Sequence, residues 1–271
     1  MSLDTFYVAG TGMSTFQNMM LTITNNVSNA QTTAYKKSEV EVESLFPKFL
    51  ETAMEEFDSA YGVGDSDKKK RKLEFGTGVR IVDVRKDFSA GTIEVTNKPL
   101  DLAIQGNGFL QFRMIDGSLA YSRDGSLRQD KEGNVVNLNG YPLEPAIKIP
   151  DGSTAISIDS VGRVFAQANN EISQREVGQI MLARFPNTEG LQSIGQNLYV
   201  ETQSTGEPIQ DVPGQNSLGS IAQYSLEFSN VNIIDEMMKM VIVQRAFELV
   251  TKAVSSGESM LRNVTDIARA G

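Results

Sequence analysis

The hydrophobic positions at the two ends of the chain follow a helical heptad pattern. From residue 6, apolar residues recur at alternating steps of three and four, at Phe6, Ala9, Met13, Phe16, Met20, Ile23, Val27 and Ala30. A similar spacing returns near the other end, at Met237, Met240, Val243, Phe247, Val250, Val254, Gly257, Leu261, Val264 and Ala268. Two such helices predict that the first and last segments pair as a coiled coil, with the middle of the chain looped out between them.

The first helix is unusual because it carries no charge. Residues 5–35 contain no Asp, Glu, Lys or Arg, and the face opposite the heptad positions is formed by Thr, Ser and Asn. A solvated helix normally covers its outer face with charged residues. The helix is therefore either buried inside a monomer or enclosed by identical neighbours, since interface cores are depleted of charge. The Asn and Gln content favours the second interpretation.

The middle of the chain changes to short alternating segments separated by Gly turns. Residues 79–84, 100–104 and 177–183 fit strands, and turns are expected at glycines that include Gly106, Gly117 and Gly140. Short strands at this spacing favour an antiparallel barrel or sandwich. The expected fold class is α+β. Its expected domains are a discontinuous helical assembly domain (1–42 with 229–271), an extended amphipathic connecting segment (43–90) and a β-rich outer domain (91–228).

A basic run lies inside the connecting segment. Within the loop expected at 62–72, the last five residues are Lys68, Lys69, Lys70, Arg71 and Lys72. They form either a solvated surface loop or an arm that contacts acidic neighbours, such as residues 39–56 of another copy. No aromatic residue is interleaved with the run, so nucleic acid is not expected to bind there.

The composition excludes several kinds of chemistry. The chain has a net charge of −9 and no Cys, His or Trp. The acidic balance argues against nucleic acid, and the missing residues remove disulfides, thiolate metal sites and histidine bases. Most candidate carboxylates lie beside Gly, where Asp forms turns. We therefore expect no catalytic, cofactor-binding or metal-binding residues and no enzyme activity.

The sequence shows neither the pattern of a membrane span nor that of a cleaved secretory signal. No stretch approaches the ~20 apolar residues of a membrane span, so no membrane insertion is expected. The first basic residue is Lys36, so the N-terminus lacks the basic start of a cleaved secretory signal.

Several motifs in order along the chain carry a family resemblance. They are Thr11-Gly12-Met13, residues 25–29, Thr33-Ala34-Tyr35-Lys36, residues 91–109, Tyr121-Ser122-Arg123-Asp124-Gly125, residues 236–248 and residues 252–261. Together they resemble the bacterial flagellar rod and hook proteins. The chain departs from that pattern at Ala34, where the family usually has a Gly that suits a positive-φ turn, and at Lys98, which is an extra residue.

The resemblance implies a structural subunit of the flagellar basal body. Within the family the chain is most similar to the distal rod proteins, with the proximal rod proteins as the alternative. Such a subunit polymerises into a helical tube that crosses the periplasm, transmits torque from motor to hook and forms part of the export channel. The implied partners are copies of itself, other rod subunits, the hook protein, basal-body ring proteins and the flagellar type III export apparatus, which uses no cleaved signal. No cofactor is implied.

The residues expected to form the assembly interface are the heptad positions. They are Met13, Phe16, Met20, Ile23, Val27, Met237, Met240, Val243, Phe247, Val250, Val254, Leu261 and Val264. Burial of these side chains alone does not offset the conformational entropy of two helices, so we expect both termini to be disordered in the free subunit. A different class of function, a carbohydrate- or peptide-binding β domain on a helical stalk, is disfavoured by the absence of Trp.

Overall fold

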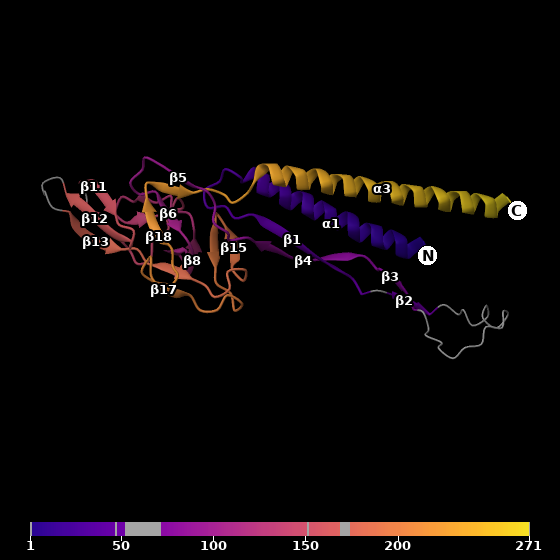
Figure 1. The fold of residues 1–271 in the computed structure, drawn as a ribbon, viewed down its shortest axis with the longest axis horizontal. Coiled ribbons are helices and arrows are strands. Elements are labelled where there is room, and N and C mark those ends of the chain that lie inside the picture. Colours follow the sequence, from indigo (N-terminus) through magenta and orange to yellow (C-terminus); the bar gives the residue numbers. More distant parts are fainter. Residues whose placement is uncertain (1, 47, 52–71, 151, 169–173, 271) are drawn as a thin grey trace. The chain divides into compact units, whose positions relative to one another are not determined.

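The computed structural model describes residues 2–46, 48–51, 72–150, 152–168 and 174–270. The described chain is α+β, with one long helix at each end and antiparallel strands between them (Figure 1). It divides into two compact units. The helical unit consists of residues 1–25, 39–85 and 234–271, and the β-rich unit consists of 26–38 and 86–233.

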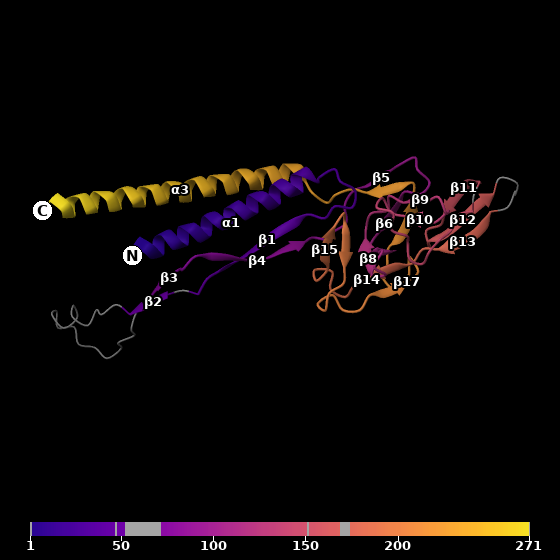
Figure 2. The ribbon, with the colours of Figure 1, turned by 180° about the vertical axis from the view of Figure 1, so that it is seen from behind.

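The helical unit is built on α1 (Ser2–Ser28) and α3 (Ile233–Ala270). α1 ends where Asn and Ser side chains compete for backbone hydrogen bonds. α3 begins directly after Asn232 and has Asp235 and Glu236 in its first turn, where the helix dipole favours negative charge. The two helices run side by side in both opposed views (Figures 1 and 2).

A β ribbon completes the helical unit on the other side of α1. β1 (Ser38–Ser44) pairs with β4 (Val79–Lys86), and β2 (Lys48–Glu51) pairs antiparallel with β3 (Lys72–Phe75). The strand expected at 79–84 is confirmed by β4. Residues 68–71 of the basic run lie outside the described residues.

The β-rich unit contains the remaining strands. They are β5 (Ile93–Val95), β6 (Leu102–Gln105), β7 (Leu110–Arg113), β8 (Leu119–Ser122), β9 (Arg128–Gln129), β10 (Val135–Val136), β11 (Ser153–Ile158), β12 (Arg163–Ala168), β13 (Arg175–Gln179), β14 (Leu182–Arg184), β15 (Gln192–Gly195), β16 (Leu198–Val200), β17 (Ile209–Asp211), β18 (Ser220–Gln223) and β19 (Ser225–Glu227). The widest sheet has the order β15-β16-β8-β7, and the next has the order β11-β12-β13. β6, β14, β5 and β9 pair with β18, β17, β19 and β10.

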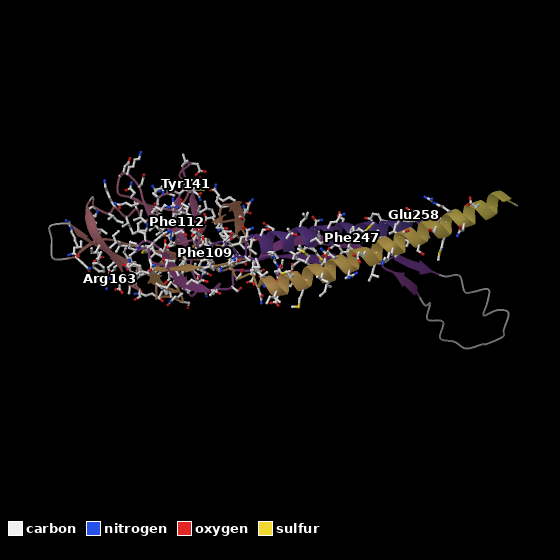
Figure 3. The ribbon with its side chains drawn as sticks, turned by 90° about the horizontal axis from the view of Figure 1, so that it is seen from above. Phe109, Phe112, Tyr141, Arg163, Phe247 and Glu258 are labelled. Atoms are coloured by element: carbon white, nitrogen blue, oxygen red, sulfur yellow. The ribbon has the colours of Figure 1, made fainter. Side chains whose placement is uncertain are left out.

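These small sheets share one apolar core. Its fully buried members include Leu102, Phe112, Leu143 and Leu182, which come from strands and from the segment that follows β10. Beside it lies a cluster that contains Phe109, Tyr121, Phe185 and Tyr199, whose rings meet edge to face. Figure 3 labels Phe109 and Phe112 within this unit.

The turns follow the sequence-based expectation. The connection from β6 to β7 contains Gly106 and Gly108, with φ of +123° and +139°. A Cβ on Gly106 would lie 2.9 Å from the Cα of Gly219, so both the conformation and the space require glycine. The strand expected at 100–104 is confirmed in part by β6, which begins at Leu102. The one expected at 177–183 is divided, because β13 ends at Gln179 and β14 begins at Leu182.

Candidate assembly interface

The central heptad positions lie on the less exposed side of each helix. On α3, Met240, Val243, Phe247, Val250 and Val254 are half-buried, and most residues between them are exposed. Phe247 lies on the side of α3 that is next to α1 (Figure 3). We call these five residues the α3 seam.

The matching positions on α1 are also withdrawn from solvent. Met13, Phe16 and Met20 are half-buried, and Ile23 is buried. A contact of 3.9 Å joins the Thr251 hydroxyl of α3 to the Met13 sulfur. The two helices therefore share an apolar side, and its knobs-into-holes packing as a coiled coil stays a prediction.

Four predicted interface residues have other environments. Met237 is 57% exposed and Leu261 is 40% exposed, so neither is covered within the subunit. Val27 is half-buried and belongs to the β-rich unit. The side chain of Val264 lies outside the described part of the chain.

α3 carries a second apolar face, which shares only Met237 with the heptad positions. Its members are exposed and recur at i, i+3, i+4, i+7 and i+8, at Ile234, Met237, Met238, Val241 and Ile242. At about 100° per residue, this face points roughly opposite to the α3 seam. We call it the α3 stripe. Exposed apolar patches of this kind mark interaction sites, so α3 presents one apolar face to α1 and a second one to solvent.

Several polar side chains of α1 donate hydrogen bonds to the backbone of the same helix. The Asn18 amide donates to the Ser14 carbonyl at 2.9 Å, and the Thr22 and Thr24 hydroxyls donate to carbonyls four residues earlier. Such bonds satisfy one donor on each of these side chains, which lowers the cost of enclosing them when a neighbouring surface excludes water. An uncharged helix with such internal hydrogen bonds is therefore suited to being enclosed by neighbouring protein.

A groove of about 500 Å³ runs between α1 and β4 within the helical unit. Its lining residues are Tyr7, Gly10, Thr11, Ser14, Thr15, Val79, Arg80 and Ile81. The Thr11 and Thr15 hydroxyls already donate to helix carbonyls, and Arg80 is paired with Glu43. None of these lining residues is a carboxylate, so the groove offers no acid, and its chemistry suits packing.

The described residues offer no metal-binding cluster. Across the described ranges, no three carboxylate side chains gather as they would around a metal ion. Among the same residues, neither helix is both long and apolar enough to cross a membrane.

In the β-rich unit, three buried charged side chains from distant parts of the sequence meet. The Lys36 ammonium lies 2.6 Å from Oε1 of Glu227, and the Arg123 guanidinium lies 2.8 Å from Oε2 of the same carboxylate. Their side chains are 0–3% exposed. We call this group the charge clamp. Lys36 comes from the segment after α1, Arg123 follows β8, and Glu227 ends β19.

Backbone groups complete the charge clamp. Lys36 also donates to the Ser89 carbonyl at 2.6 Å, and the Gly91 N–H donates to Glu227 Oε1 at 2.9 Å. Arg123 donates to the carbonyls of Gly106 and Gly108 at 2.9 and 3.1 Å. The buried charges are therefore paired and hydrogen-bonded, as burial requires.

The electrostatics follow from this geometry. Burial disfavours the ionised form of Glu227, but Arg123 and Lys36 together with the Gly91 N–H outweigh it and hold its pKa below the usual 4.5. Burial lowers the pKa of the Lys36 ammonium, and Glu227 opposes that shift. Two oxygens at 2.6 Å from Nζ support the charged form of Lys36.

Comparison with known proteins identifies the family. The family described as "Flagella basal body rod protein" matches residues 6–36, "Flagellar hook protein FlgE/F/G D1 domain" matches residues 103–166, and "Flagellar basal body rod FlgEFG protein C-terminal" matches residues 222–267. The chain is also 35% identical over 267 residues to the flagellar basal-body rod protein FlgG of Buchnera aphidicola subsp. Schizaphis graminum, covering 98% of this chain and 100% of that protein. It belongs to the flagellar basal-body rod proteins.

Other FlgG proteins match over nearly the same span. The FlgG of Borreliella burgdorferi is 34% identical over 97% of this chain and 98% of its own, and that of Bacillus subtilis is 30% identical over 98% and 100%. The chain is thus a structural rod subunit of the flagellar basal body, most like FlgG, which is the distal rod protein. It assembles with itself and with other basal-body components, and the family is a structural one.

The matched regions of this rod protein contain the α3 surfaces and members of the charge clamp. The N-terminal match includes α1 from Phe6 onward and Lys36, and the C-terminal match includes Glu227, the α3 stripe and the α3 seam. Sequence reasoning predicted the seam from its heptads. Of the stripe it predicted only Met237, although the recurrence from Ile234 to Ile242 was readable, and it missed the charge clamp.

Proposed function

We propose that this rod subunit polymerises into the helical tube of the distal rod. The tube crosses the periplasm, carries torque from motor to hook and encloses part of the export channel. The main support is that α3 has two apolar faces, together with similarity to FlgG along almost the whole chain. A helix inside one subunit needs one apolar face, whereas a helix in a tube wall needs a second for its neighbour.

The two faces have different tasks in this proposal. The α3 seam packs on α1 as a coiled coil, and the α3 stripe packs on another copy of the chain. Fully burying one Ile or Met side chain contributes about 1.5–3 kcal/mol, so the stripe supplies a strong drive for association. Because the stripe meets a different surface on the next copy, the contact does not close into a dimer and continues as a helical polymer.

The remaining contacts extend the same proposal. The other rod subunits, the hook protein and the ring proteins meet the ends and the outside of the tube, and the basic run 68–72 acts as a contact arm. The subunit reaches the periplasm through the flagellar type III apparatus without a cleaved signal. In the free subunit the terminal helices are disordered, and they fold when copies assemble.

Electron microscopy of the purified chain tests polymerisation. We expect Ile242→Asp, at a 67% exposed stripe position, to abolish tubes because it buries an unpaired carboxylate. Ile115→Asp is the matched control, since it makes the same change at a 94% exposed position in the turn between β7 and β8. Tubes of normal length from Ile242→Asp, or their loss in both variants, would contradict the role of the stripe.

A further inference from the structure

The chain passes between its two compact units at four places. On the β-rich side, the residues next to these four crossings lie in one hydrogen-bonded network. The crossings lie at 25/26, 38/39, 85/86 and 233/234. We call the adjoining residues of the β-rich unit the four exits. Any force that travels along the covalent chain between the units must enter the β-rich unit through them.

Hydrogen bonds join each exit to the next. Asn26 donates to the Ser38 carbonyl and accepts from the Ser38 N–H, both at 2.9 Å, which joins the first exit to the second. The Asp87 N–H donates to the Lys37 carbonyl at 2.9 Å and joins the second to the third. The Asn230 amide donates to the Asp87 carbonyl at 2.9 Å and accepts from the Lys37 N–H at 2.9 Å, which brings in the fourth.

The charge clamp connects these linked exits to the core of the β-rich unit. Lys36 lies beside the second exit and bonds both to Glu227 and to the Ser89 carbonyl after the third. Glu227 precedes the fourth exit and is held by Arg123, which bonds the carbonyls of Gly106 and Gly108 in the loop between β6 and β7. One connected network therefore runs from all four exits into the core of the β-rich unit.

We propose that the charge clamp is the mechanical joint of the rod subunit, with Lys36 as the positioning residue that keeps the four exits in one arrangement under load. This inference rests on the proposed torque-transmitting role. Stability alone does not explain the clamp, because replacing a buried ion pair by apolar residues of similar volume is often neutral or stabilising. Hydrogen bonds to buried charges are directional and short, so they resist the sliding of one exit past another, which apolar contacts permit.

Hydrogen exchange on the unassembled full chain is the first test. In Lys36→Met, we expect the amides of Ala34, Lys37 and Asp87 to exchange together on the order of 100-fold faster, the effect of removing one of the two cations that pair with the buried Glu227 carboxylate. Those three amides donate to Glu227, Asn230 and Lys37. Lys148→Met, at an exposed lysine of the same unit, is the control and should change none of them.

The second test separates stiffness from stability. Lys36→Met, Arg123→Met and Glu227→Leu together replace all three buried charges by apolar side chains, so this triple variant should recover stability while leaving the exits loosely joined. Rods isolated from cells that carry the triple variant should form but break in controlled flow at lower shear than wild-type or Lys148→Met rods. Wild-type shear resistance in the triple variant, or unchanged exchange in Lys36→Met, overturns the proposal. Because exchange is measured before assembly, its result stands even if the polymerisation proposal fails.

Discussion

Replacing Arg123 by Met tests how much the charge clamp contributes to the free energy of unfolding. The side chain is 3% exposed and makes a 2.8 Å ion pair with Glu227. It also donates to three backbone carbonyls, at Gly106, Gly108 and Ile104. Met keeps much of the apolar volume but supplies no donor. Removing one partner of a buried pair costs about 3–5 kcal/mol, because the other charge stays buried without full compensation.

Thermal unfolding of the full chain, followed by circular dichroism of the strands, measures that loss. For a unit of this size, each kcal/mol lowers the melting temperature by about 2–4 °C, so we expect a fall of roughly 6–20 °C. Arg113→Met is the matched control, since its 3.0 Å pair with Glu144 is solvent-exposed and such pairs contribute about 0–1 kcal/mol. A loss in Arg123→Met no larger than in the control refutes the reasoning.

Three further changes have defined outcomes. Phe112→Ala empties a fully buried position of the core and should cost about 3–5 kcal/mol in urea unfolding. Ala34→Gly should raise stability by up to about 1 kcal/mol in the same assay, because Ala34 has φ of +55° and glycine adopts this conformation without strain. Because the pKa of Glu227 is held below 4.5, its ionised form stabilises the fold fully above that pH. The stability advantage of wild type over Glu227→Gln should therefore shrink as the pH falls below about 4.5, and a constant advantage down to pH 3 contradicts this.

The elements that depend on local pattern were predictable. The heptads gave the ends of the chain as helices, and Gly-rich turns separated the strands, because both signals come from residues close in sequence. The split of residues 177–183 between β13 and β14 was not predictable from the same pattern. Ile180 is buried in the shared core, where tertiary packing decides the path of the chain.

The charge clamp was hidden because its partners lie far apart in sequence and charged residues are mostly exposed. Alternation around residue 226 predicts Leu226 inside and Glu227 outside. The structure has the reverse, with Glu227 buried and Leu226 half-buried, because Lys36 and Arg123 fill the inward side. Only the bend at Ala34 gave a local signal. Its positive φ places the N–H on the Glu227 carbonyl at 2.8 Å, so the segment keeps the turn although it lacks glycine.

The α3 stripe and the charge clamp have different roles in this rod subunit, and variants at each can test them separately. The α3 stripe is apolar, and hydrophobic contact depends on buried area more than on direction, which suits the joining of copies. The charge clamp is directional and is complete within one subunit, which suits the fixing of chain segments that carry force. Changes in the stripe should therefore alter how much polymer forms, and changes in the clamp should alter how well a formed polymer resists shear. If variants at one site changed the amount of polymer and its shear resistance equally, assembly and stiffness would share a single cause. The separate roles assigned to the stripe and the clamp would then be wrong.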